Sequence, residues 1–214
     1  MSRPVLGIVV ATVLVAAGVA TFVLFFQEDV TDQAGPARGT AAETAIVDFA
    51  PGPNPRNAIG HIHEAARQNH DALRLVALKE VSSVDSDERW AAVYALSIVI
   101  QPGDAEGIST LERLLASDDL DERLASADGL GAVGEKSGIP VLIALLDSEE
   151  TTDYVVIPVW RVARGLLLAR VDQDLGLVNA ADGRAARSVR PAWESWWAER
   201  GSSVEWDPAT GRFR

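Results

Sequence analysis

Apolar residues in this chain follow two patterns, first one continuous run and later a helical spacing. Residues 5–26 contain no charged side chain. As a helix this run would be about 33 Å long at ~1.5 Å per residue, enough to cross the hydrocarbon core of a membrane. The pattern predicts an N-terminal transmembrane anchor over residues 1–27, with the membrane contact at residues 5–26.

Charged residues on the two sides of the run predict its orientation. Arg3 precedes the run, whereas Glu28 and Asp32 follow it, and positive charge is favoured on the cytoplasmic side. We therefore expect a single-pass cell-membrane protein with a cytoplasmic N-terminus and an extracytoplasmic remainder. A cleaved signal peptide is the alternative, but cleavage after Ala20 would leave the apolar residues 21–26 exposed.

Residues 28–56 are rich in Ala, Gly and Pro and show no sustained helical or strand period. Pro51, Pro53 and Pro55 alternate with other residues, which favours a stiff, extended backbone. We predict a tether that carries the following domain, residues 57–201, away from the membrane.

Two helix-like segments recur within residues 57–201. Residues 108–117 (ISTLERLLAS) align with residues 139–148 (IPVLIALLDS), with apolar residues at i, i+3, i+6 and i+7. Residues 87–96 align with residues 121–130, and both begin with Asp-Glu-Arg. Carboxylates favour the start of a helix, and the Ala and Gly that follow allow neighbouring helices to approach closely. The alternation predicts stacked helical hairpins.

These stretches, from "DERWAAVYALSIV" to "DERLASADGLGAVGEKSGIPVLIALLDS", resemble HEAT and HEAT-like repeats over residues 71–170. The shared features include Arg89, Arg123 and the Leu130-Gly131 ending. The resemblance implies an all-α fold, a short α-solenoid of about three helical hairpins with atypical capping helices, of the bacterial membrane-anchored type. Such solenoids present surfaces to many kinds of partner, so the resemblance says little about function.

The third copy departs from the pattern. No arginine stands at the expected place, and Pro158 falls where a helix interior is expected, which predicts a kinked or split helix. The helices over residues 57–69 and 183–201 are expected to cap the stack, and residues 202–214 form a C-terminal tail.

Charge and composition narrow the possible partners. The net charge is −12, and residues 57–150 carry 7 basic against 18 acidic side chains. An acidic body repels phosphate backbones, so no nucleic-acid partner is expected. The chain has no cysteine, which excludes disulfides, thiolate metal sites and cysteine nucleophiles.

All three histidines lie within residues 60–70, and His61, His63 and Glu64 are the candidate metal ligands. On a helix His61 and His63 point in opposite directions, and Arg67 stands at i+4 from His63, where a second ligand is needed. A polar helix face is favoured, and a metal-binding sensor on this segment is the alternative. We therefore expect no metal.

Aromatic and basic residues of the last helix are the candidate partner-binding residues. Trp193, Trp196 and Trp197 share one helix face, where they either close the open end of the solenoid or anchor a partner. The arginines of this helix either pair with the acidic repeats or form a patch for carboxylates or anionic headgroups. They are Arg184, Arg187 and Arg190, and Arg161 and Arg164 have the same spacing in the preceding helix.

No phosphate loop, nucleophile elbow or His–Ser pair is present in the sequence. We therefore expect no catalytic residue, no cofactor and no enzymatic activity. The predicted function is a scaffold or accessory subunit that presents a helical surface to a membrane or extracytoplasmic protein complex. A HEAT-like enzyme of the bilin-lyase type is the alternative, and for that class Tyr94 and Asp128 are the pair to inspect.

Overall fold

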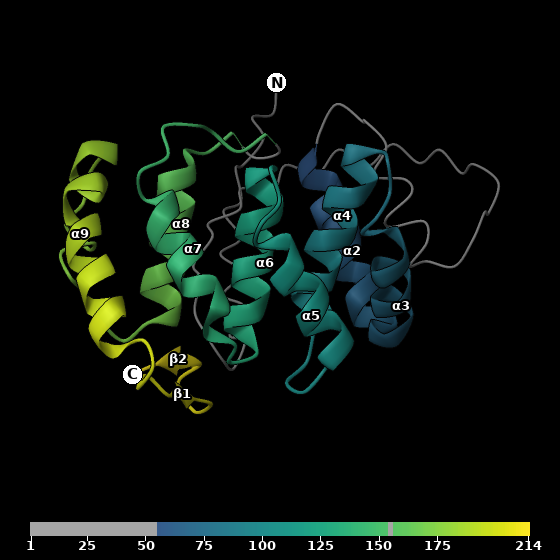
Figure 1. Ribbon diagram of the computed structural model, residues 1–214. Coiled ribbons are helices and arrows are strands. Elements are labelled where there is room, and N and C mark those ends of the chain that lie inside the picture. Colours follow the sequence, from purple (N-terminus) through teal and green to yellow (C-terminus); the bar gives the residue numbers. More distant parts are fainter. Residues whose placement is uncertain (1–54, 154–155) are drawn as a thin grey trace, which may run out of the picture.

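The computed structural model describes residues 55–153 and 156–214 (Figure 1). The predicted anchor at residues 5–26 and nearly all of the predicted tether lie outside this part. Within it, no helix is both long and apolar enough to cross a membrane. The described residues form an all-α protein with one short two-stranded ribbon, which confirms the all-α part of the predicted fold class. The helices are α2 (Pro55–Gln68), α3 (His70–Glu80), α4 (Ser86–Val99), α5 (Ala105–Leu114), α6 (Leu120–Ala132), the 3-10 helix η1 (Lys136–Gly138), α7 (Ile139–Leu145), α8 (Val159–Arg170) and α9 (Gly183–Arg200).

The helices form two layers. Helix α3 packs on α4, α5 on α6 and α7 on α8, which gives three consecutive hairpins. Helices α2, α4, α6 and α8 lie side by side in one layer, and α9 packs beside α7 in the other. Figure 1 shows the hairpins following one another in chain order from α3 to α9. This arrangement is compatible with a short α-solenoid flanked by single helices at both ends.

The repeated Ser-x-Asp sequence is a helix start. In α4 the Asp85 side chain accepts hydrogen bonds from the backbone N–H groups of Asp87 and Glu88. In α6 Asp119 does the same for Asp121 and Glu122. These bonds satisfy N–H groups that have no partner inside the helix, so both helices begin at the same place in their repeats.

An arginine–glutamate contact joins two neighbouring repeats. Arg89 of α4 donates through Nε to Oε1 of Glu122 in α6 at 2.6 Å, and Ser117 donates to the other carboxylate oxygen at 2.7 Å. Glu122 is only 2% exposed. The equivalent Arg123 has a buried Nε with no hydrogen-bond partner in the described part of the chain. Helices α6 and α8 are instead joined by Asp128 and Arg170, at 2.6 Å.

Helix α8 differs from the expectation of a helix broken at Pro158. The helix begins only after this proline, which occupies the N-cap position. The preceding chain folds back on itself, with Thr152 N–H donating to the Ile157 carbonyl at 2.8 Å and a bridge between Thr151 and Pro158. The proline therefore starts the helix instead of kinking it, since its missing N–H is not needed there.

The C-terminal tail packs back on the stack. Strands β1 (Trp206–Asp207) and β2 (Arg212–Phe213) form an antiparallel pair, and Phe213 is buried against α8. Trp206 covers Gly134, which has φ +86°; a Cβ there would lie 2.8 Å from the indole. Residues 202–214 are therefore part of the folded body.

Candidate functional site

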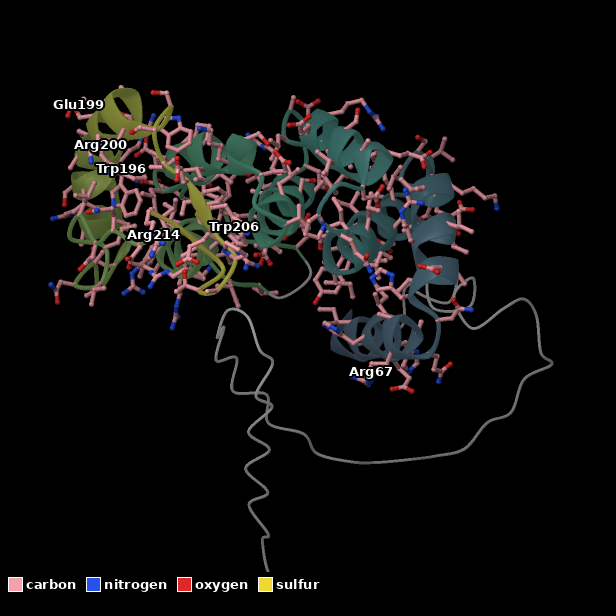
Figure 2. All side chains as sticks on the ribbon, turned by 90° about the horizontal axis from the view of Figure 1, so that it is seen from below. Arg67, Trp196, Glu199, Arg200, Trp206 and Arg214 are labelled. Atoms are coloured by element: carbon pink, nitrogen blue, oxygen red, sulfur yellow. The ribbon has the colours of Figure 1, made fainter. Side chains whose placement is uncertain are left out.

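The predicted partner-binding tryptophans of α9 differ in exposure. Trp193 is fully buried and packs in the core, so its side chain is part of the closure of the stack. Trp196 and Trp197 are half-buried, with their ring centroids 5.9 Å apart. Figure 2 shows Trp196 and Arg200 on α9 at one end of the molecule, with Arg67 of α2 at the other end.

The predicted arginine trio of α9 is also divided. Arg187 pairs with Asp147 and Glu149, both at 2.6 Å. Arg190 pairs with Asp147 at 2.8 Å and with Glu194 on its own helix. The hydrogen bond to Glu149 is the main reason that the pKa of Arg187 is raised. These two arginines join α9 to the end of α7, as the intramolecular alternative predicts.

Arg184 has a different environment. Its side chain is exposed and has no ion-pair partner within residues 55–153 and 156–214. It lies in the first turn of α9, beside Gly183, whose Cα approaches the indole of Trp160 so closely that an added Cβ would lie 3.0 Å from Nε1. Of the three predicted arginines, Arg184 alone is left for an external partner.

A hollow of about 340 Å³ lies between the first half of α8 and the loop that leads to α9. Arg164 forms one wall, and its guanidinium donates to the carbonyl oxygens of Leu177 at 2.6 Å and Val178 at 2.8 Å. Arg161 is exposed and has no ion-pair partner in the described part of the chain. The lining consists of Pro158, Trp160, Arg161, Arg164, Val178, Asn179, Ala180 and Ala181.

One exposed aliphatic side chain lines this hollow, and a second lies two residues before its lining in the sequence. Val178 belongs to its lining and is 56% exposed. Val156 is 74% exposed and precedes the lining residue Pro158 by two positions. Its φ of +51° is unusual for a β-branched residue and costs conformational energy. We call Val156, Trp160, Arg161, Val178 and Arg184 the α8 surface.

A second hollow, of about 220 Å³, lies between α7 and α9. Trp197 contributes to it, together with Ile143, Pro140 and Ala144 of α7 and two further residues of α9, Glu194 and Ala198. The lining is largely apolar and contains no arginine.

The candidate metal ligands His63 and Glu64 contact different side chains. The Nε2 atom of His63 lies 3.0 Å from the Tyr94 hydroxyl oxygen, whereas Glu64 accepts hydrogen bonds from Arg67 and from Gln68. Burial, and secondarily Arg67, lowers the pKa of His63. His61 is exposed. The structure brings together no group of three potential metal ligands among the residues it describes.

Tyr94 and Asp128, the pair inspected for an enzyme, lie on adjacent helices. Burial, and secondarily the charge of Asp128, raises the pKa of Tyr94 to about 12, so the phenol stays protonated at neutral pH. Its ring stacks on Trp90 with centroids 5.3 Å apart. Asp128 is engaged by Arg170. Neither of the two hollows described above contains this pair.

Comparison of the chain with protein families, with curated proteins and with solved structures finds no match. Functional conclusions therefore depend on the residues of this chain alone. The spacing of Arg161 and Arg164 is visible in the sequence, but the loop that completes the hollow is not. The segment around Val178 has no periodicity, and only the fold brings it against α8.

Proposed function

We propose that this chain is a non-catalytic, membrane-anchored scaffold or accessory subunit, built on a HEAT-like solenoid, that presents the α8 surface to a protein partner at the membrane. The composition of that surface supports the proposal. It combines two exposed valines with Trp160 and two arginines that have no ion-pair partner among the described residues. Interfaces are enriched in Trp and Arg, and an exposed apolar patch with a polar rim is typical of a binding surface.

The other candidate side chains on α9 are already engaged within the protein. Arg187 and Arg190 are neutralised by acidic residues, and Trp193 is in the core. The α8 surface thus combines two arginines that have no ion-pair partner among the described residues with the exposed side chains of Val156 and Val178. Anchoring by residues 5–26 would place this surface near other proteins of the same membrane.

A variant pair tests the partner-binding proposal. Tagged full-length chain, solubilised in mild detergent, is expected to retain a partner in a fixed ratio. Val178→Glu should reduce the retained amount at least about tenfold, because it places a charge in the apolar centre of the interface. Leu75→Glu is the matched control, since Leu75 is a 63% exposed aliphatic residue on α3. Retention that is equal in both variants, or a parent chain that is monomeric, would contradict the proposal.

The absence of cysteine allows a clean test of the orientation. Ser195 is exposed on α9, so Ser195→Cys gives the chain a single accessible thiol. A membrane-impermeant maleimide should label this thiol in intact cells, because the proposed topology places the solenoid outside the cytoplasm. Labelling that requires lysis of the cells would show the opposite orientation, and recovery of the chain in the soluble fraction would show that it is not anchored.

A further inference from the structure

The hollow beside α8 has an unusual electrostatic character for this protein. Its lining contains Arg161 and Arg164 but no acidic residue, although the chain as a whole carries a net charge of −12. We propose that this hollow is a binding site for a small organic anion, in which a carboxylate or phosphate group contacts the two guanidinium groups. The hollow shares Trp160, Arg161 and Val178 with the α8 surface, but the inference goes beyond the scaffold function, and its test needs no protein partner.

Arg164 is held in position by groups that do not neutralise it. Its Nε and Nη2 atoms donate to the carbonyl oxygens of Leu177 and Val178, and these acceptors carry no net charge. Within the described part of the chain, no hydrogen bond engages Nη1 of this guanidinium. A cation that is fixed in place and still charged loses little conformational entropy when it binds an anion.

Arg161 supplies the second positive charge. It lies one helical turn before Arg164, and both side chains line the same hollow. On α9, by contrast, Arg187 and Arg190 already form ion pairs with Asp147. Two arginines without an ion-pair partner among the described residues match the paired oxygen atoms of a carboxylate or phosphate. The positive end of the α8 dipole, where Pro158 forms no side-chain cap, adds to the same potential.

The other lining residues fit the carbon part of such a ligand. Trp160, Pro158 and Val178 offer apolar surface, and Asn179 offers an amide that can donate or accept. A volume of about 340 Å³ lies at the lower end of the range for small-molecule sites. The site therefore suits a compact molecule with one anionic group and a small apolar part.

Fluorine NMR of the full-length chain in mild detergent tests the site, with 5-fluorotryptophan in place of tryptophan. Trp160→Phe assigns the Trp160 resonance, and the other five tryptophans are internal controls. Three probes with the same ring are titrated at matched ionic strength: benzoate, phenyl phosphate and benzyl alcohol. A saturable shift of the Trp160 resonance is expected with an anionic probe and not with the alcohol. The stronger of the two anions identifies the preferred acid group.

Two charge-matched variants complete the experiment. Arg161→Gln should weaken anion binding about tenfold or more, since a charge-assisted contact is lost. Arg200→Gln, which removes an exposed arginine from the other end of α9, should leave binding unchanged. Arg161 is exposed, so its substitution should not affect folding. The proposal is overturned if benzyl alcohol shifts the resonance equally, if neither anion gives a saturable shift, or if both variants weaken binding alike.

Discussion

The environment of Asp121 disfavours the ionised form of its carboxyl group. It lies in the first turn of α6 and is 9% exposed. It accepts a hydrogen bond from the backbone N–H of Asp153 at 2.8 Å, but the side chains of Asp119 and Asp153 add negative charge nearby. Burial is the main cause that raises its pKa from 3.8 to about 6. The ionised form is therefore destabilised in the native state relative to the unfolded chain.

The pH dependence of stability follows from this shift. The native state holds the Asp121 proton up to about pH 6, whereas the unfolded chain releases it near 3.8. As the pH rises from about 3.8 to about 6, the free energy of unfolding falls because of this group. Above about pH 6 the carboxyl is ionised in both states, and the free energy falls no further. Asp121→Asn keeps an acceptor for Asp153 but has no charge, so it should raise the free energy of unfolding by about 1 kcal/mol at about pH 7.5.

Urea denaturation at two pH values measures this effect. At about pH 4 the advantage of Asp121→Asn should be largely lost, because the native carboxyl of the parent is then protonated. Asp118→Asn is the control, since Asp118 is exposed next to the same helix start and should change stability by less than about 0.5 kcal/mol. A change in stability by Asp121→Asn that is equal at both pH values would show that the pKa of Asp121 is not raised in the native state, and would contradict the prediction.

Glu122 shows how far residue-level reasoning from the sequence reaches. The Asp-Glu-Arg repeat predicts helix starts, and the structure confirms them through the aspartate caps. The sequence does not show that Glu122 is buried and receives Arg89 from the preceding repeat. That contact depends on the stacking of α4 on α6, which local periodicity does not fix.

At the scale of elements, two helical glycines, one on α6 and one on α8, have opposite surroundings. Gly129 of α6 faces α4, and a Cβ there would lie 2.8 Å from the Cα atom of Ser97. Gly165 of α8 is exposed, with nothing within 4 Å of an added Cβ. The α4–α6 contact is therefore as close as two helix backbones allow, whereas α8 has no neighbour at this position.

Because of this difference, the same Gly→Ala substitution should stabilise the protein at one position and destabilise it at the other. Gly165→Ala should raise the free energy of unfolding by roughly 0.5–1 kcal/mol, because alanine restricts the unfolded chain and favours the helix. Gly129→Ala should lower it by about 1–3 kcal/mol, because the added methyl group overlaps the backbone of α4. Thermal and urea denaturation monitored by circular dichroism measure both. Stabilisation by both variants would mean that α4 and α6 are farther apart than in this structure.

Helix boundaries were predicted well where a cap residue marks them, and less well elsewhere. The predicted end cap at residues 183–201 corresponds to α9, with Asp182 as its N-cap. The sequence pattern places Pro158 inside a helix because the alignment with the preceding repeat continues through residues 151–158. The structure inserts a loop there, closed by Thr152 and Ile157, and a repeat alignment cannot reveal an inserted loop of this kind.

At the scale of the whole molecule, the apolar core is divided between the two halves of the stack. One cluster contains buried residues of α2 to α6, such as Leu73 and Leu96. The other runs from α6 to the C-terminal ribbon and contains Trp193 and Phe213. Helix α6 contributes to both clusters, so it is the element that couples them. Stacked repeats with mostly neighbour-to-neighbour contacts can lose one end while the other remains folded.

Phe213 tests whether the halves unfold separately. Its ring is buried and lies 5.0 Å from that of Trp206, and its carbonyl accepts from the Asp172 N–H at 2.8 Å. Phe213→Ala should cost about 3–5 kcal/mol locally, by loss of apolar contact and by the cavity that it leaves. Hydrogen exchange read by mass spectrometry should then increase in α7, α8 and α9, while α3 and α4 keep their protection.

A variant in the first apolar cluster provides the reciprocal test of separate unfolding. Leu73→Ala removes a buried side chain from the first cluster, and exchange should then increase in α2, α3 and α4 but not in α9. If both variants increase exchange to the same extent throughout residues 55–153 and 156–214, the stack unfolds as one cooperative unit through α6. A separate response would instead show that the end carrying the α8 surface can open while the N-terminal hairpins stay folded.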